Sequence, residues 1–184
     1  MIAARYQPAA ALIAAYLTTL LLAVWLISLP VHVVWLSLIL GAGLVLLSLI
    51  DMREGVLPDW LTLPLLAAGL FVSWWFAFGP PLWHVLGAIG GGVTIVAINL
   101  GYRKVRKVDG IGYGDAKLLA ASGAWLGLLA LPTVLLWACA TGLFQVLLMA
   151  RTGTEVSGRT ALAFGPHLAF GTWLTWLFGA VGLD

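Results

Sequence analysis

Seven apolar stretches constrain the fold of this sequence more than any other feature, and all but the fifth are close to the length that crosses a lipid bilayer. The fifth is shorter, and a re-entrant turn at its start is the alternative to a full crossing. A membrane-spanning helix needs about 20 predominantly apolar residues. Hydrophobic residues make up 62% of the chain and charged residues 9%, a composition that excludes a soluble domain. The sequence therefore predicts an all-α, polytopic membrane helix bundle that forms a single domain over residues 1–184. The predicted spans cover residues 9–29, 31–50, 61–78, 82–100, 117–131, 132–150 and 162–183.

The distribution of Lys and Arg predicts how this bundle is oriented. The breaks at 30, 79–81 and 131–132 carry no charge. The other three breaks carry nearly all of it, and they cover 51–59, 101–114 and 151–159. If each stretch crosses once, all 9 Lys and Arg residues lie on one side, which the positive-inside rule identifies as cytoplasmic. We expect the N-terminus inside and the C-terminus outside. The two shortest breaks leave open whether spans one and two, or five and six, are kinked hairpins.

A carboxylate and an amine stand at the start of the fifth predicted span. Asp115 follows Gly112 and Gly114, and Lys117 comes two residues later. An Asp at the centre of a membrane helix costs roughly 2.5 to 3.5 kcal/mol, so we expect this chain to face Asp115 into a protein or water cavity and to use it. The alternative is that Asp115 caps a helix and the glycines form a loop. Lys117 would stabilise the carboxylate charge or contact a lipid phosphate.

A second carboxylate, Asp51, ends the second predicted span, at the same predicted depth as Asp115. Two carboxylates that share a site cannot both ionise easily, so such a pair holds a single proton. The ionised member can then draw a proton from water while the protonated member donates to a carbonyl oxygen, which is the chemistry of peptide-bond hydrolysis. Asp59 is the main alternative to Asp51. It follows Pro58 and suits a cap or first-turn position of the third span.

Three motifs follow one another along the chain. Asp51 precedes the run VLPDWLT at 56–62, the run GYGDAK covers 112–117, and AFGPH covers 163–167. In this order they resemble the type IV prepilin peptidase family of GxGD membrane aspartyl proteases, over most of the chain from Asp51 onward. The resemblance implies that Asp51 and Asp115 are the catalytic pair. The candidate substrate-binding or site-supporting residues are Gly112, Gly114, Gly165 and Pro166 of these motifs, together with Lys117, Asp59 and His167.

This resemblance also implies a substrate and a location. Family members cut a short basic leader from prepilins or pseudopilins at the cytoplasmic face of the bacterial inner membrane. The expected partners are such precursors and membrane lipid, with no nucleic acid, no metal and no organic cofactor. Larger members carry a cysteine-bearing cytoplasmic domain between the first two spans and also N-methylate the product. This chain has only residues 30–32 there, which puts methyltransferase activity in doubt.

His167 stands where the family usually has an apolar residue. It would tune the carboxylate pair or sense pH, or it would simply pack and form hydrogen bonds. The alternative function class is a non-catalytic membrane protein, such as a secretion scaffold or a small proton-coupled transporter. Transporters place carboxylates near the bilayer midplane between repeated halves, and neither feature is found in this sequence.

Overall fold

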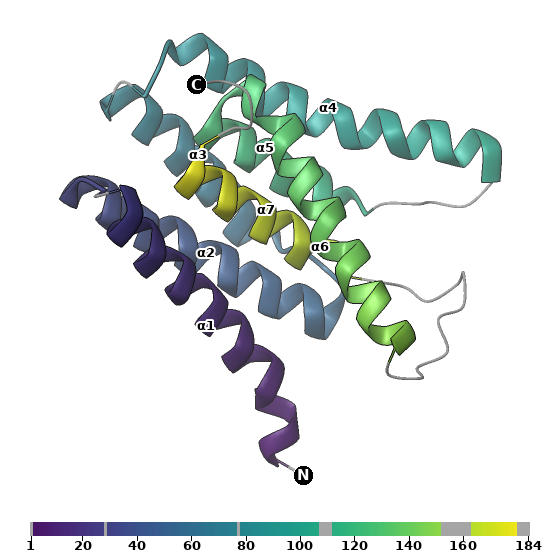
Figure 1. Cartoon of the computed structure of the whole chain (residues 1–184). Helices are drawn as coiled ribbons and strands as arrows, with labels where there is room; N and C mark the ends of the chain where they lie inside the picture. Colours follow the sequence, from purple (N-terminus) through teal and green to yellow (C-terminus); the bar gives the residue numbers. More distant parts are fainter. Residues whose placement is uncertain (1, 28, 77, 107–111, 152–162, 180–184) are drawn as a thin grey trace.

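The computed structural model describes residues 2–27, 29–76, 78–106, 112–151 and 163–179 (Figure 1). Across these residues the chain forms seven α-helices and one short 3-10 helix, so the predicted all-α fold is confirmed. Parts of the predicted breaks 101–114 and 151–159, and of the last predicted span, lie outside the described residues. The elements are α1 (Ile2–Ile27), α2 (Val31–Glu54), α3 (Asp59–Phe76), α4 (Pro81–Arg106), α5 (Tyr113–Leu126), η1 (Leu128–Ala130), α6 (Leu131–Arg151) and α7 (Gly165–Phe178).

Within the residues that the structure describes, five helical segments are long and apolar enough to cross a membrane. They are Ala10–Ile27, Val31–Glu54, Asp59–Phe76, Pro81–Lys104 and Leu128–Arg151. The helices α5 and α7 have 14 described residues each. Both lie inside the bundle (Figure 1): α5 contacts α3, α4 and α7, and α7 also contacts α1, α2 and α6. Nearly every side chain of α5 from Asp115 to Trp125 is buried, which explains why its sequence is apolar all round.

Several helices run further than the predicted spans, and two of them bear on the charged breaks. The helix α2 continues past Asp51 to Glu54, and α4 continues through Arg103 and Lys104 to Arg106. The added residues are mostly good helix formers and include no proline. The helix α2 ends at Gly55, which has a φ of 67° and donates its N–H to the carbonyl oxygen of Asp51. Asp51 therefore lies in the last turn of a helix, held more firmly than the predicted helix-to-loop junction would hold it.

The close contact between α4 and α5 depends on glycine. A Cβ added at Gly87 would stand 2.5 Å from the carbonyl oxygen of Gly123, and one added at Gly91 would collide with the carbonyl oxygen of Leu119. Small residues allow helices in a membrane to approach until their backbones touch. Gly87 and Gly91 therefore let α4 and α5 pack backbone to backbone, and this contact fixes the direction in which α5 carries Asp115.

Candidate active site

Four helix ends meet at one end of the bundle and bring the predicted motifs together. The last turn of α2 carries Asp51, and the first turns of α3, α5 and α7 carry Asp59, Asp115 and Gly165. These ends are in contact: Gly165 touches the Asp51 side chain, Gly114 touches Leu57 in the α2–α3 loop, and Lys117 pairs with Asp59. Residues from three distant parts of the sequence therefore form one site.

Asp51 and Asp115 line the same cavity, which has a volume of about 300 Å³. One carboxylate comes from α2 and the other from α5, as the sequence predicts. Both residues are 8% exposed, so each carboxylate is largely shielded from its surroundings yet reaches the cavity. The remaining lining residues are Gly55, Val56, Leu57, Gly112, Tyr113, Gly114 and Lys117.

The first residue of α7 sits directly on the Asp51 carboxylate. A Cβ added at Gly165 would stand 2.5 Å from Oδ2 of Asp51. The backbone N–H of Gly165 interacts with the same carboxyl group, at the end of α7 where the helix dipole favours negative charge. Among the described residues, Oδ2 of Asp51 is buried without a hydrogen-bond partner. Gly165 thus holds the carboxylate in place, and one of the carboxylate oxygens is left for another ligand.

Asp115 occupies the first turn of α5, ahead of the predicted span 117–131 and outside all five segments that could cross a membrane. Its backbone N–H donates to the carbonyl oxygen of Gly112 at 3.2 Å. Burial, and after it the charge of Asp51, raise the pKa of Asp115 to about 6. The ordinary pKa of Asp is about 3.9. Asp115 therefore keeps its proton closer to neutral pH than a solvated carboxyl group does, and the two carboxylates act on each other electrostatically.

The two glycines before Asp115 have different surroundings. A Cβ added at Gly114 would stand 2.9 Å from Cβ of Leu57, which is tighter than side chains tolerate. A Cβ added at Gly112 would find its nearest neighbour, Oδ2 of Asp115, at 3.7 Å, which is ordinary contact. Gly112 also has a φ of −68°, which any residue can adopt. Only Gly114 is therefore required by space, because it lets the α2–α3 loop close over the start of α5.

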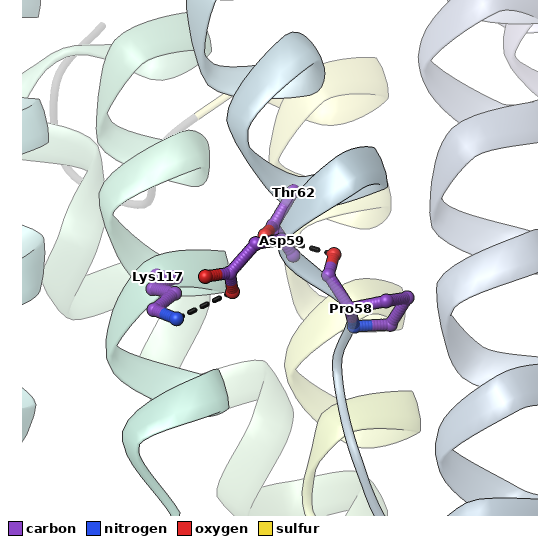
Figure 2. Close-up of polar contacts among 4 residues, drawn as sticks. All are labelled: Pro58, Asp59, Thr62 and Lys117. Carbon is purple, nitrogen blue, oxygen red and sulfur yellow. Dashed lines mark hydrogen bonds and ion pairs between the residues drawn. The ribbon is translucent and has the colours of Figure 1, made fainter.

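Lys117 and Asp59 form an ion pair at the rim of the cavity (Figure 2). Asp59 occupies the first turn of α3, as predicted, and its side chain is 58% exposed. Beside it the hydroxyl of Thr62 donates to the carbonyl oxygen of Pro58 at 3.1 Å. Lys117 lines the cavity with Asp51 and Asp115, whereas Asp59 does not. The ammonium group of Lys117 on α5 thus binds the carboxylate of Asp59 on α3. The sequence did not predict Asp59 as the partner of Lys117.

His167 lies beside this site and faces α6. One ring nitrogen, Nδ1, is 3.2 Å from Oγ1 of Thr141, and the other, Nε2, is 2.7 Å from Oε1 of Gln145. The ring is not part of the cavity that holds Asp51 and Asp115. Of the two predicted roles, the hydrogen-bonding one agrees with these contacts.

Comparison with known proteins places this chain in a family. Residues 38–147, which include both Asp51 and Asp115, match the type IV leader peptidase family. The chain belongs to this family.

Three relatives of the type IV leader peptidase family illustrate the match, and each is named prepilin leader peptidase/N-methyltransferase. The chain is 47% identical to the one from Burkholderia pseudomallei (strain 1026b) over 140 residues, which cover 76% of this chain and 45% of that protein. It is 42% identical to the one from Dickeya chrysanthemi over 139 residues, 76% of this chain and 46% of that protein. It is 37% identical to the one from Pseudomonas aeruginosa over 142 residues, which cover 77% of this chain and 49% of that protein. The chain spans about half the length of these curated relatives. No solved structure matches it.

Two further residues shape the site of this leader peptidase family member, and the sequence analysis did not identify either as a site residue. Gly55 ends α2 in a left-handed conformation, and Leu57 packs against Gly114. A glycine directly after a charged helical turn is a recognised signal for a helix C-terminus and could have identified Gly55. The role of Leu57 had no such signal, because its contact with α5 joins residues far apart in the chain.

Proposed function

We propose that this chain is a prepilin leader peptidase in which Asp51 and Asp115 act together as an aspartic catalytic pair. One observation carries the proposal: two buried carboxylates from different helices line one cavity, inside the region that matches the type IV leader peptidase family. The names of the relatives support the choice of substrate, since each is called a prepilin leader peptidase.

In the proposed reaction the two carboxylates have different starting roles. Asp115, whose pKa is raised to about 6, begins protonated and donates to the carbonyl oxygen of the scissile bond. Asp51 begins ionised, with the Gly165 N–H beside it, and draws a proton from water as that water attacks the carbonyl carbon. The proton on Asp51 then passes to the departing amine as the C–N bond breaks, and Asp115 regains its own proton. The net change is the addition of one water molecule across one peptide bond.

The substrate would be a prepilin or pseudopilin precursor. Its apolar helix would lie in the lipid against this bundle while its short basic leader reaches the cavity at the helix ends. By the predicted topology these ends face the cytoplasmic side of the bacterial inner membrane. The proposal concerns the peptidase half of the relatives' names, because the carboxylate pair is the chemistry that the site supplies. It involves no organic cofactor and no nucleic acid.

Co-expression with a prepilin tests this proposal. The wild-type chain should convert the precursor to a shortened product on a gel, whereas Asp51→Asn and Asp115→Asn should each abolish the conversion. Asn keeps the volume of Asp but cannot cycle a proton, so both variants should still insert in the membrane at wild-type levels. Full activity in either variant would refute the pair. A precursor that stays full length beside well-folded wild-type protein would favour the scaffold alternative.

A further inference from the structure

A cavity of about 480 Å³ lies at the end of the bundle opposite the two carboxylates. It is bounded by the start of α2, the α3–α4 loop, the start of α4, the ends of α5 and α7, and η1 (Figure 1). Asp115 lies in the first turn of α5 and Leu126 ends that helix, so about 16 Å of helix separates this cavity from the catalytic one. Neither the family match nor the proposed chemistry of the carboxylates gives it a role.

His84 supplies a hydrogen-bond acceptor to this cavity. The residue is 4% exposed, and its Nδ1 lies 3.1 Å from the carbonyl oxygen of Ala124. A carbonyl oxygen only accepts, so Nδ1 carries a proton, and in the neutral ring Nε2 keeps its lone pair. Within the described part of the chain no hydrogen bond engages Nε2, which lies 3.8 Å from a Cβ added at Gly79 in the cavity wall. A buried acceptor in this state favours a ligand that donates a hydrogen bond.

Aromatic rings form much of the remaining wall, and they belong to Phe78, Trp83, Trp125 and Trp176. The Trp176 ring stands at 88° to the rings of Trp125 and Phe78, with centroid distances of 5.5 and 5.7 Å. The indole N–H groups of Trp125 and Trp176 donate to Leu65 and Ser37, neither of which lines the cavity. These two residues therefore offer the cavity π-electron surface rather than donors. Aromatic rings gathered around one space bind organic cations.

The charge around the cavity also favours a cation. The described residues that line it include no Lys, Arg, Asp or Glu. Two helices, α5 and α7, end there, and the carbonyl groups of a helix C-terminus carry partial negative charge. The first turns of α2 and α4 border the same space, and a helix N-terminus favours a negative group. A ligand that carries an ammonium group beside a phosphate matches both kinds of helix end.

The cavity lies where the headgroups of membrane lipids are found. It adjoins the ends of two segments that can cross a membrane, Asp59–Phe76 and Pro81–Lys104. Trp83 and Phe78 are exposed at its edge, and tryptophan is enriched at the level of lipid headgroups. A lipid headgroup can therefore enter the cavity while its acyl chains stay in the bilayer.

We propose that this cavity binds a phosphate ester of ethanolamine, which the membrane supplies as the headgroup of phosphatidylethanolamine. The primary ammonium group donates a hydrogen bond to Nε2 of His84 and lies against the rings of Trp83 and Trp176. The inference goes beyond the proposed peptidase reaction and does not depend on it, because none of these residues belongs to the catalytic cavity.

The test compares three lipids with identical acyl chains, added to the full chain in detergent. Phosphatidylethanolamine has a primary ammonium group, phosphatidylcholine has a quaternary one without an N–H, and phosphatidylglycerol has none. Native mass spectrometry measures the Kd of each. The wild type should bind phosphatidylethanolamine about tenfold or more tightly than phosphatidylcholine, because only the former can donate to His84. Phosphatidylglycerol should bind most weakly, because it lacks the cation.

Two substitutions and a matched control locate this binding. His84→Asn places an amide N–H where Nδ1 lies, so it keeps the bond to Ala124 and removes only the acceptor Nε2. This variant should bind phosphatidylethanolamine and phosphatidylcholine equally. Trp83→Leu should weaken the binding of both by about threefold or more. The control is Trp74→Leu, since Trp74 is 73% exposed on α3 and does not line the cavity. It should bind all three lipids as the wild type does.

Glycerophosphoethanolamine, which has the headgroup without acyl chains, identifies the source of the ligand. If it displaces phosphatidylethanolamine at equal concentration, the headgroup alone is recognised and a soluble ester can occupy the site. If it does not, the acyl chains add to the affinity and the ligand is the membrane lipid.

Equal affinity of the wild type for the three lipids would overturn the proposal. An undiminished preference for phosphatidylethanolamine in His84→Asn would also overturn it. If His84→Asn does not fold, the comparison of Trp83→Leu with Trp74→Leu decides, and equal affinities in these two variants would show that the lipids bind elsewhere.

Discussion

The carboxylate of Asp51 and the backbone of Gly165 touch so closely that no side chain fits between them. A Cβ at position 165 would stand 2.5 Å from Oδ2 and 2.9 Å from Cγ of Asp51. Gly165→Ala must therefore push the carboxylate away from the cavity or lift the start of α7. A displacement of about 1 Å in an active site can cost about 100-fold in rate, and we expect at least that loss in kcat for leader cleavage.

The control for this prediction is Gly101→Ala on α4, where an added Cβ meets nothing within 4 Å. This variant should cleave at the wild-type rate. Wild-type activity in Gly165→Ala would show that the contact with Asp51 is not needed for catalysis.

The two glycines of the GxGD motif should respond differently to the same change. Gly114→Ala places its Cβ 2.9 Å from Cβ of Leu57, so the α2–α3 loop must move away from α5 and widen the cavity. Gly112→Ala meets only ordinary contact at 3.7 Å. We expect Gly114→Ala to lower kcat/KM by about tenfold or more, and Gly112→Ala to stay within about threefold of wild type. Equal losses in the two variants would contradict this assignment of roles.

Asp59→Asn should keep most of the cleavage activity, in contrast to Asp51→Asn. The Asp59 side chain is 58% exposed and its partner Lys117 is 41% exposed. Exposed ion pairs contribute about 0 to 1 kcal/mol, so thermal unfolding in detergent should shift by only a few degrees. Leader cleavage and the unfolding temperature are both measured for Asp59→Asn and for the wild type. Complete loss of cleavage in well-folded Asp59→Asn would move the catalytic role from Asp51 to Asp59.

The sequence predicted the parts of this molecule that depend on local pattern. The apolar stretches predicted the seven α-helices found in the described part of the chain, and the charged breaks predicted Asp51 and Asp115 at ends of α2 and α5 on one side. The first-turn position of Asp59 followed from Pro58 before it. Each of these depends on a residue and its near neighbours, which a sequence displays directly.

The remaining features depend on how helices pack, and no local pattern carries that information. The pairing of Lys117 with Asp59 and the contact of Gly165 with Asp51 join helices that are far apart in the chain. The helix α2 extends to Glu54 although a charged break is typical of a loop, because most of the added residues are good helix formers. The structure also has a cavity lined by Tyr16, Met52, Gln145 and Phe170. These residues come from four different helices, so only the folded chain brings them together.

The rate of leader cleavage should fall as pH rises above about 6. The working pair holds one proton, and the pKa of Asp115 is raised to about 6 by burial and by Asp51. Below this pH Asp115 keeps its proton, and above it the doubly ionised pair accumulates. The expected result is a fall in kcat/KM of up to about tenfold per pH unit between pH 6 and 8. A rate that rises through this interval would contradict the assignment of Asp115 as the acid.

The contact between α4 and α5 should determine the stability of the bundle, and two neighbouring glycines can test this. A Cβ at Gly91 collides with the carbonyl oxygen of Leu119, a backbone atom that cannot turn aside. Gly91→Ala should therefore destabilise the protein by about 1 to 3 kcal/mol, the usual cost of overpacking.

At Gly92 the nearest atom to an added Cβ is Cβ of Ala120, at 3.8 Å. Alanine is favoured over glycine in a helix by about 1 kcal/mol, so Gly92→Ala should be neutral or stabilising. Thermal unfolding of both variants in detergent measures the difference. Because the α4 contact sets the direction of α5, Gly91→Ala should also cleave more slowly, whereas Gly92→Ala should not. If the two variants unfolded at the same temperature, backbone contact between α4 and α5 would not be what holds Asp115 toward Asp51.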